Sequence, residues 1–316
     1  MNKFIKHIIL GAGGAIGKVL SDELINNNEK VKLVSRRGCS ISGAEMSKAD
    51  LTIYSELKNA VEDSSIVYLT AGLAYDKKIW SDQWPKIMKN TIDICKEKNA
   101  RLIFFDNVYS YGMVEGKMTE ETPYNPISKK GEIRAKIADK LMSEVKNNNI
   151  NAVIARSADF YGPYSEKSSI PYILIIDKLS KGKKAQWMVN DNVIHSFTYT
   201  ADCGKALFQI SKNDEAFNQV WHLPTAHPPI TGKDFINTVA EKLGCSAKYT
   251  VLKSWMIKSA GLFDKQTSEL HEMLYQYKYD YIFDSSKFEN KFNFTPTSYE
   301  LGISNTLKES AKKNHH

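Results

Sequence analysis

The stretch that decides the fold is Gly11-Ala12-Gly13-Gly14-Ala15-Ile16-Gly17, which follows the apolar run His7-Ile8-Ile9-Leu10. An amphipathic segment, Lys18 to Ile25, comes directly after it. An apolar run, a glycine cluster and an amphipathic segment predict a strand, a tight turn and a helix. The glycines fit the pattern Gly-x-x-Gly-x-x-Gly, whereas Gly-x-Gly-x-x-Gly fails because Ile16 occupies its last position.

Glycines in such a turn let the chain reverse and let backbone N–H groups approach a pyrophosphate at the positive end of the helix. The sequence therefore predicts a dinucleotide site, which we assign to Gly11, Gly14, Ala15, Ile16 and Gly17. The alternative is a glycine-rich loop that binds no ligand. The strand before the loop and the helix after it favour the cofactor.

The end of the second predicted strand, Val31 to Val34, bears on the choice between NAD and NADP. In NAD sites an acidic residue about twenty positions beyond the glycines accepts a hydrogen bond from the ribose. Here that position holds Ser35, followed by Arg36 and Arg37. A guanidinium binds a 2′-phosphate through paired N–H donors, whereas an acid would repel it. We therefore predict NADP as the cofactor and keep NAD as the alternative, with the arginines then being solvated turn residues.

Further apolar runs alternate with helical segments through the first half of the chain. This rhythm predicts an α/β fold of the Rossmann type, a doubly wound parallel sheet with ligands at the carboxyl ends of its strands. Ala71 and Gly72 end one buried strand and are small enough for a cofactor ribose to approach. We expect a Rossmann domain over residues 1–163, with return segments near 193–222. Residues 164–316 are expected to form mostly a smaller substrate-binding region that covers the sheet edge.

The bulk composition excludes several classes of protein. The 316 residues carry a formal net charge of +7, and the lysines are scattered, which argues against a nucleic-acid partner. No apolar run reaches the length of a membrane span, so we expect no membrane partner. The four cysteines lie far apart, which argues against a disulfide framework or a metal site and fits a cytoplasmic protein: Cys39, Cys95, Cys203 and Cys245. A homodimer stays open.

With these segments placed, the chain resembles the extended short-chain dehydrogenase/reductase family, in its epimerase/dehydratase group. Five motifs occur in the family's order: the glycine pattern, Asp50-Leu51, Tyr111-Gly112, Arg156 with Tyr161-Gly162-Pro163, and Phe197-x-Tyr199-x-x-Asp202. The resemblance implies that Asp50 and Leu51 lie against the adenine of the cofactor. It also implies an NAD(P)-dependent enzyme that acts on a small molecule.

The catalytic positions depart from the family pattern. Family members use a Tyr-x-x-x-Lys pair, in which the lysine helps the tyrosine to move a proton near neutral pH. In the matching helix Lys130 replaces the tyrosine and Arg134 replaces the lysine. The family's catalytic serine is Asn107 here, and its substrate-contacting asparagine is Asp159. His195 aligns with a family arginine that often binds substrate phosphate.

The resemblance and the residue chemistry together predict four catalytic residues, Asn107, Tyr109, Lys130 and Arg134, and two substrate residues, Asp159 and His195. Arg134 can hold ribose hydroxyls but cannot lose a proton. Tyr109 offers a phenol as proton donor, and the alternative is a packing aromatic. Lys130 could act as an acid if it is buried beside the like charge of Arg134, and the alternative is a solvated surface lysine.

Two functions follow from this pattern. One is an NADP-dependent oxidoreductase or epimerase that acts on a small molecule bearing a hydroxyl or carbonyl group, with a non-standard active site. The other is a non-catalytic NAD(P)-binding sensor or regulatory protein, which the missing tyrosine favours.

Overall fold

The computed structural model describes residues 6–314, and the chain divides into two compact units. Unit 1 comprises the described residues up to Ser110, Lys130–Arg156 and Cys203–Trp221. Unit 2 comprises Tyr111–Lys129, Ser157–Asp202 and the described residues from His222 onward. The chain thus leaves unit 1 at Arg156, earlier than the boundary at residue 163 that the sequence suggested, and it also leaves unit 1 between residues 111 and 129.

Unit 1 is built on a seven-stranded sheet in the order β12-β7-β5-β4-β1-β2-β3. Every pairing from β3 across to β7 is parallel. The doubly wound α/β fold predicted from the sequence is therefore confirmed. The strands are β1 (Lys6–Leu10), β2 (Lys30–Ser35), β3 (Glu45–Lys48), β4 (Ile66–Leu69), β5 (Arg101–Asp106), β7 (Ala152–Arg156) and β12 (Gln219–His222).

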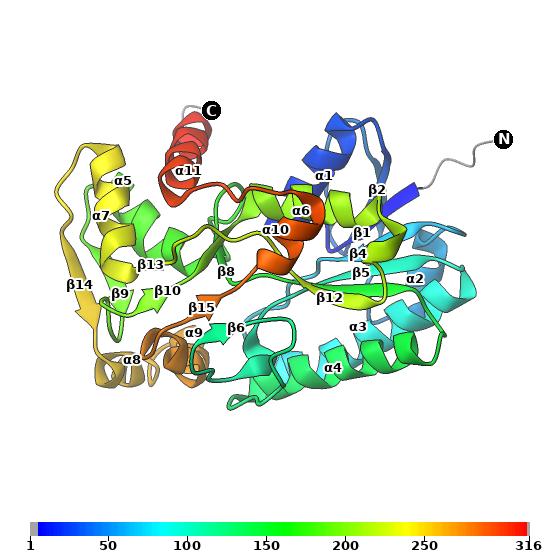
Figure 1. The fold of residues 1–316 in the computed structure, drawn as a ribbon, viewed down its shortest axis with the longest axis horizontal. Helices are drawn as coiled ribbons and strands as arrows, with labels where there is room; N and C mark the ends of the chain where they lie inside the picture. Colours follow the sequence, from blue (N-terminus) through cyan, green and yellow to red (C-terminus); the bar gives the residue numbers. More distant parts are fainter. Residues whose placement is uncertain (1–5, 315–316) are drawn as a thin grey trace. The chain divides into compact units, whose positions relative to one another are not determined.

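Helices cover both faces of this sheet, α1 and α6 on one side and α3 and α4 on the other (Figure 1). The central strands are apolar runs with almost no exposed surface, as a sheet covered on both faces requires. No helix within residues 6–314 is long and apolar enough to cross a membrane. The helices are α1 (Ala15–Asn26), α2 (Tyr54–Ala60), α3 (Lys77–Glu97), α4 (Lys129–Lys146) and α6 (Thr200–Ser211).

Two glycines of the first loop are required by packing. Gly11 has φ of +91°, and a Cβ there would collide with the backbone of Ala71 at the end of β4. A Cβ on Gly17 would lie 2.7 Å from Cα of Ala12. Both positions therefore need glycine for the strand, the loop and α1 to pack closely.

The long helix α3 begins at Lys77, before Trp80, where the apolar periodicity of its sequence starts. Asp76 caps it, because its Oδ1 accepts hydrogen bonds from the backbone N–H groups of Lys78 at 2.7 Å and Ile79 at 3.3 Å. Aspartate is a favoured cap because its side chain satisfies N–H groups that have no partner within the helix. The apolar periodicity alone missed this first turn.

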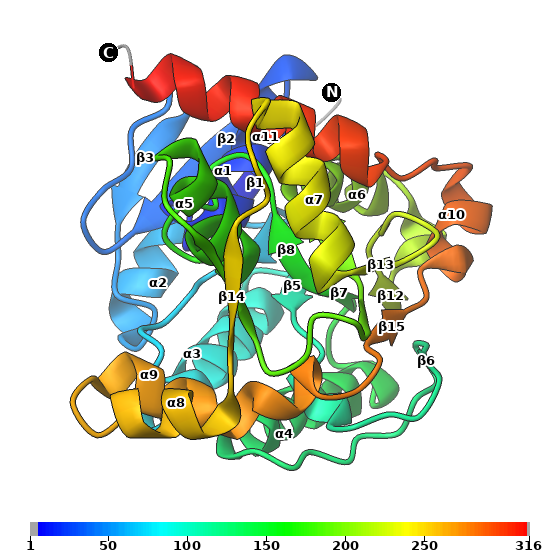
Figure 2. The same cartoon turned by 90° about the vertical axis from the view of Figure 1, so that its left-hand side faces the viewer.

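Unit 2 consists of short strands, in two-stranded sheets, and helices around an aromatic core, which includes Trp187, Phe197 and Phe235 (Figure 2). Its strands are β6 (Lys117–Met118), β8 (Asp159–Tyr161), β9 (Ala185–Met188), β10 (Ile194–His195), β11 (Phe197–Tyr199), β13 (Ile230–Thr231), β14 (Tyr249–Leu252) and β15 (Ile282–Phe283). Its helices are α5 (Asp177–Ser180), α7 (Gly232–Leu243), α8 (Ser254–Ala260), α9 (Lys265–Leu270), α10 (Ser286–Phe292) and α11 (Tyr299–Asn314).

Candidate active site

The glycine loop leaves the start of α1 open. Gly14 is the N-cap of this helix, no side chain caps it, and no acidic residue lies in the first turn. Gly13 and Gly14 are exposed, and a Cβ on Gly14 would come no closer than 3.6 Å to its nearest neighbour, the carbonyl oxygen of Gly11. The uncapped N–H groups from Ala15 onward and the helix dipole favour an anion here.

The carboxyl end of β2 carries three polar residues with unused hydrogen-bonding capacity. Ser35 Oγ is buried and has no hydrogen-bond partner among the described residues. Arg36 and Arg37 are exposed, and neither forms an ion pair with a carboxylate of residues 6–314. Such a set can accommodate an anionic group at this edge of the sheet.

Asp50 lies close enough for the charge of Arg36 to act on it. Its Oδ1 accepts from the backbone N–H of Thr52 at 2.9 Å and from the Thr52 hydroxyl at 2.7 Å. The hydroxyl contact is the main reason that the pKa of Asp50 lies below its ordinary value, and Arg36 contributes in the same direction. Leu51 beside it is buried, whereas Ala71 is half-buried and Gly72 exposed at the end of β4.

Beyond β5 the chain forms a short 3₁₀ turn over Tyr109–Tyr111. Asn107 Oδ1 accepts a hydrogen bond from the backbone N–H of Tyr109 at 3.1 Å, so its side chain shapes this turn. The Tyr109 ring stacks on Trp80 with centroids 6.3 Å apart, and its hydroxyl lies 3.5 Å from the hydroxyl of Tyr75. Tyr109 is half-buried, so packing and access to solvent coexist at this phenol.

Lys130 is fully buried, so the alternative of a solvated surface lysine is wrong. Its Nζ lies 4.4 Å from the centroid of the Tyr75 ring, in a cation–π contact. Tyr75 thus touches both Lys130 and Tyr109 and links these two predicted catalytic residues within unit 1.

Arg134 is held by a buried carboxylate. Asp106 Oδ1 accepts a hydrogen bond from Arg134 Nε at 2.7 Å and also contacts Nη2, while Oδ2 accepts from Arg156 Nε at 3.1 Å. Asp106 and Arg156 are fully buried, and Arg134 is 4% exposed with its guanidinium 4.4 Å from the Trp84 ring centre. Two cations therefore share one anion at the end of β5. The prediction that Arg134 holds ribose hydroxyls stays a prediction.

The predicted substrate residues meet within unit 2. Asp159 Oδ2 lies 3.1 Å from Nε2 of the buried His195, and it accepts a hydrogen bond from the Tyr277 hydroxyl at 2.9 Å. His222, in the same unit, is fully buried, with Nε2 2.7 Å from the Tyr111 hydroxyl and Nδ1 2.8 Å from the Asp284 carbonyl oxygen. Both ring nitrogens of His222 have partners, so this residue supports the fold of unit 2.

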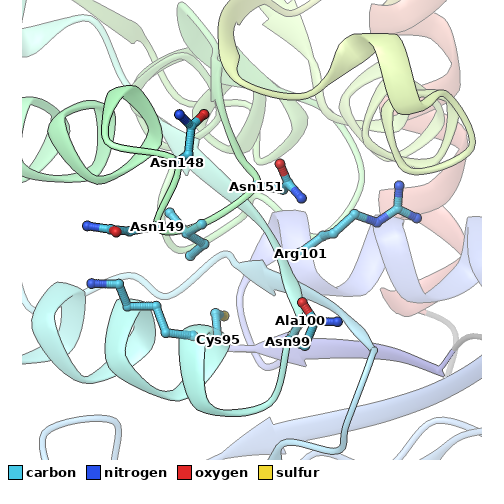
Figure 3. Close-up of a pocket in the computed structure, with 9 residues that line it drawn as sticks. Cys95, Asn99, Ala100, Arg101, Asn148, Asn149 and Asn151 are labelled. Atoms are coloured by element: carbon cyan, nitrogen blue, oxygen red, sulfur yellow. The ribbon is translucent and has the colours of Figure 1, made fainter.

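A polar cavity of about 150 Å³ lies in unit 1 at the amino ends of β5 and β7 (Figure 3). Its two cationic side chains are already paired, Arg101 with Asp214 at 2.5 Å and Lys96 with Glu144 at 2.6 Å. The glycine loop follows the carboxyl end of β1, at the opposite edge of the parallel sheet. Ligands of such sheets bind at the carboxyl edge, so this cavity is not the candidate active site.

Three residues with direct contacts to the predicted site residues were missed by the sequence analysis: Tyr75, Asp106 and Tyr277. Asp106 is the last residue of β5, directly after an apolar run, which is a usual place for a functional carboxylate and a signal that the sequence contains. Tyr277 lies 118 positions from its partner Asp159, in a tyrosine-rich stretch of the sequence. No local spacing indicates such a pair.

A family model described as the NAD dependent epimerase/dehydratase family matches residues 7–222. An uncharacterized UDP-glucose epimerase of Bacillus subtilis is 20% identical over 227 residues, which cover 64% of this chain and 71% of that protein. A dTDP-4-dehydrorhamnose reductase of Mycolicibacterium smegmatis is 26% identical over 216 residues. That alignment covers 64% of this chain and 59% of the reductase, less than two thirds of its length.

Solved structures with the same fold include dTDP-glucose 4,6-dehydratase from Bacillus anthracis in complex with NAD, with a TM-score of 0.81 at 14% identity over 98% of each chain. UDP-glucose 4-epimerase from Thermus thermophilus in complex with NAD gives a TM-score of 0.78 at 14% identity. That match covers 96% of this chain and 98% of the epimerase. At this identity the likeness establishes the fold.

Proposed function

The chain belongs to the NAD dependent epimerase/dehydratase family, and on that premise we propose that it is an NADP-dependent oxidoreductase or epimerase. Its substrate is a small molecule that carries a hydroxyl or carbonyl group. The observation that carries the proposal is the open glycine loop at the start of α1, which has the shape and polarity that a pyrophosphate requires. We also propose a cytoplasmic location, because widely spaced cysteines are typical of proteins in a reducing compartment.

Gly14, Ala15, Ile16 and Gly17 would hold the pyrophosphate through their backbone N–H groups. Asp50 and Leu51 would hold the adenine, and Ala71 and Gly72 leave room for a ribose because a Cβ on Gly72 would meet nothing within 4 Å. Ser35, Arg36 and Arg37 would bind a 2′-phosphate. The buried Ser35 hydroxyl without a partner and the two unpaired guanidinium groups support NADP over NAD.

Tyr109 is the proposed proton donor or acceptor. When bound, the nicotinamide would supply or accept a hydride. The oxygen of the substrate then gains or loses a proton, which a phenol at the end of β5 can exchange. Tyr75 orients the Tyr109 hydroxyl, and the buried charge of Lys130 on the Tyr75 ring favours negative charge nearby.

A non-catalytic dinucleotide sensor is the second candidate function. It is favoured by one observation, the engagement of Arg134 with Asp106 and Phe105. Of the pair of helix residues that the family uses, one is replaced by a buried lysine and the other is tied to a structural carboxylate. The two functions share cofactor binding and differ in turnover.

Cofactor binding is tested by Gly14→Val. Gly14 has φ of −79°, which any L residue adopts, and space for a Cβ, so the variant should fold. Its branched side chain would fill the place of the pyrophosphate, and NADPH binding followed by fluorescence should be lost. Ala260→Val, at an exposed position of α8 in unit 2, is the control and should bind like the wild type. A folded Gly14→Val protein with unchanged affinity would exclude this cofactor site.

Turnover separates the two functions. We expect wild-type protein to oxidise NADPH in the presence of at least one member of a panel of small aldehydes, ketones and sugars. Tight NADPH binding without any oxidation across the panel would favour the sensor.

A further inference from the structure

Asp159 begins β8 and is held in a fixed orientation by two donors. Its Oδ2 receives the Tyr277 hydroxyl at 2.9 Å and lies 3.1 Å from His195 Nε2, and both partners are at most 2% exposed. Its Oδ1 has no hydrogen-bond partner among the described residues, and the side chain of Asp159 is 18% exposed. One carboxylate oxygen of Asp159 is thus held by neighbouring side chains, and the other can accept a hydrogen bond from a ligand.

His195 is enclosed by aromatic rings. It stacks on Phe197, Tyr277 and Tyr281 with centroid distances of 4.7, 4.7 and 4.4 Å, and it packs edge to face with Trp187 at a centroid distance of 6.0 Å. The Nδ1 atom of His195 is buried without a hydrogen-bond partner among residues 6–314. Of the two ring nitrogens, Nε2 is therefore the one that faces a hydrogen-bond partner, Asp159 Oδ2. This contact and the stacked rings fix the orientation of His195 beside the carboxylate.

No lysine or arginine of residues 6–314 forms an ion pair with Asp159. Its Oδ2 is held instead by a phenol and an imidazole nitrogen. An ionised carboxylate only accepts hydrogen bonds, so its free oxygen can bind a hydroxyl, an amine or an ammonium group. A phosphate presents like charge and no donor when it is fully ionised, so it is repelled.

The distribution of arginine points the same way. All five arginines of the sequence belong to unit 1: Arg36, Arg37, Arg101, Arg134 and Arg156. Unit 2 therefore contains none of the side chains best suited to grip a phosphate with two parallel N–H donors. Where the family resemblance places a phosphate-binding arginine, the chain has the fully buried His195.

We propose that Asp159 Oδ1 binds a hydroxyl or amino group of the substrate, and that the substrate is a neutral or cationic hydroxy- or amino-carbonyl compound without a phosphate. His195 and Tyr277 position the carboxylate. The proposal rests on the proposed function and names its substrate class. It separates this chain from relatives named for UDP-glucose and dTDP-sugars.

The test compares wild type with Asp159→Asn on defined probes: glyceraldehyde, glyceraldehyde 3-phosphate, glucose, glucosamine, glucose 6-phosphate and UDP-glucose. NADPH-loaded protein is titrated by calorimetry, and NADPH oxidation is followed in parallel. Asparagine keeps the shape and a carbonyl acceptor but removes the charge. We expect the wild type to bind the unphosphorylated probes more tightly than their phosphorylated partners. In the variant this ratio of affinities should fall by about ten- to a hundredfold, because one charge-assisted hydrogen bond contributes that much to binding.

Two further variants keep the outcome clear. Asp177→Asn makes the same change in α5, where Asp177 pairs with Lys181 at 2.6 Å, and should alter no preference. Asp159→Ser replaces the carboxylate by a smaller neutral group and serves if the asparagine variant fails to fold.

The proposal is overturned if phosphorylated probes bind the wild type as well as their unphosphorylated partners, or if no probe distinguishes wild type from the Asp159 variants. NADPH oxidation with phosphorylated probes alone would overturn it while supporting the proposed function. Probe binding that depends on Asp159, without any NADPH oxidation, would support the ligand class and refute catalysis.

Discussion

Asp106 is the anion that allows two arginines to be buried at the end of β5, and its replacement by asparagine should destabilise unit 1 severely. The carboxylate has one oxygen for Arg134 and another for Arg156. The amide of asparagine offers one acceptor only, and its NH₂ group would face a guanidinium. One fully or nearly fully buried cation would thus lose its acceptor, and both would lose the compensating charge.

Breaking a buried ion pair in this way costs about 3–5 kcal/mol of unfolding free energy. The matched control is Asp214→Asn, which removes the charge from the pair between Arg101 and Asp214. That contact is as short, at 2.5 Å, but the Asp214 side chain is 93% exposed. Water replaces the lost partner there, so we expect little or no change in stability.

Urea unfolding followed by tryptophan fluorescence measures the difference, and Trp84 reports locally because its ring contacts the Arg134 guanidinium. The midpoint of the Asp106→Asn variant should fall well below those of the wild type and of Asp214→Asn. If the unfolding free energies of Asp106→Asn and Asp214→Asn differed by less than about 1 kcal/mol, burial would not determine how much these ion pairs contribute to stability, and the reasoning would be refuted.

Three further outcomes are expected. Tyr109→Phe should lower NADPH oxidation by roughly 10²–10⁴-fold in stopped-flow assays while leaving NADPH affinity unchanged, and a variant within about threefold of the wild type would exclude Tyr109 as proton donor. Arg36→Ala combined with Arg37→Ala should weaken NADPH binding by about ten- to a hundredfold and leave NADH binding unchanged, and equal losses for both would argue against a phosphate contact. Burial lowers the pKa of His7 from 6.5 to about 4, so the folded protein favours the neutral ring. The contribution of His7 to the unfolding free energy is therefore fully present above about pH 6.5. It is lost as the pH falls toward 4, by up to about 3 kcal/mol. In the His7→Phe variant, the urea midpoint should change less with pH over that range. A pH dependence equal to that of the wild type would assign the acid sensitivity to other groups.

The parts of the fold that follow from local sequence were predictable. The glycine pattern, the apolar run before it and the buried strands require no knowledge of distant residues, because each acts on its immediate neighbours. The start of α3 at Lys77 was missed although its cap, Asp76, is a local signal, because apolar periodicity was given more weight than capping. The burial of Lys130, in contrast, could not be predicted from local sequence. It depends on which residues pack over the lysine, and the Tyr75 ring that contacts it lies far away in the sequence.

The candidate site was predictable only where a motif fixes the position. Asp159 and His195 were found through the resemblance, but their relation to each other and to Tyr277 depends on β8, β10 and the turn after α9 coming together in unit 2. Likewise, the partners of Asp106 lie 28 and 50 positions away in sequence. Contacts over such separations are set by tertiary packing, and single-sequence periodicity carries no record of them.

The cationic residues on α4 are the reason that we propose a proton donor outside this helix. A helix that places Lys130 and Arg134 one turn apart on a buried face brings two positive charges together, and each needs compensation. Asp106 compensates Arg134, and the electron-rich face of Tyr75 stabilises Lys130. Arginine cannot release a proton, and Nζ of Lys130 lies against the face of the Tyr75 ring. We therefore propose that the phenol of Tyr109 exchanges the proton, with Asn107 and Tyr75 as the residues that contact Tyr109. In this proposal, the role that the family resemblance gives to a helix residue belongs to the turn after β5.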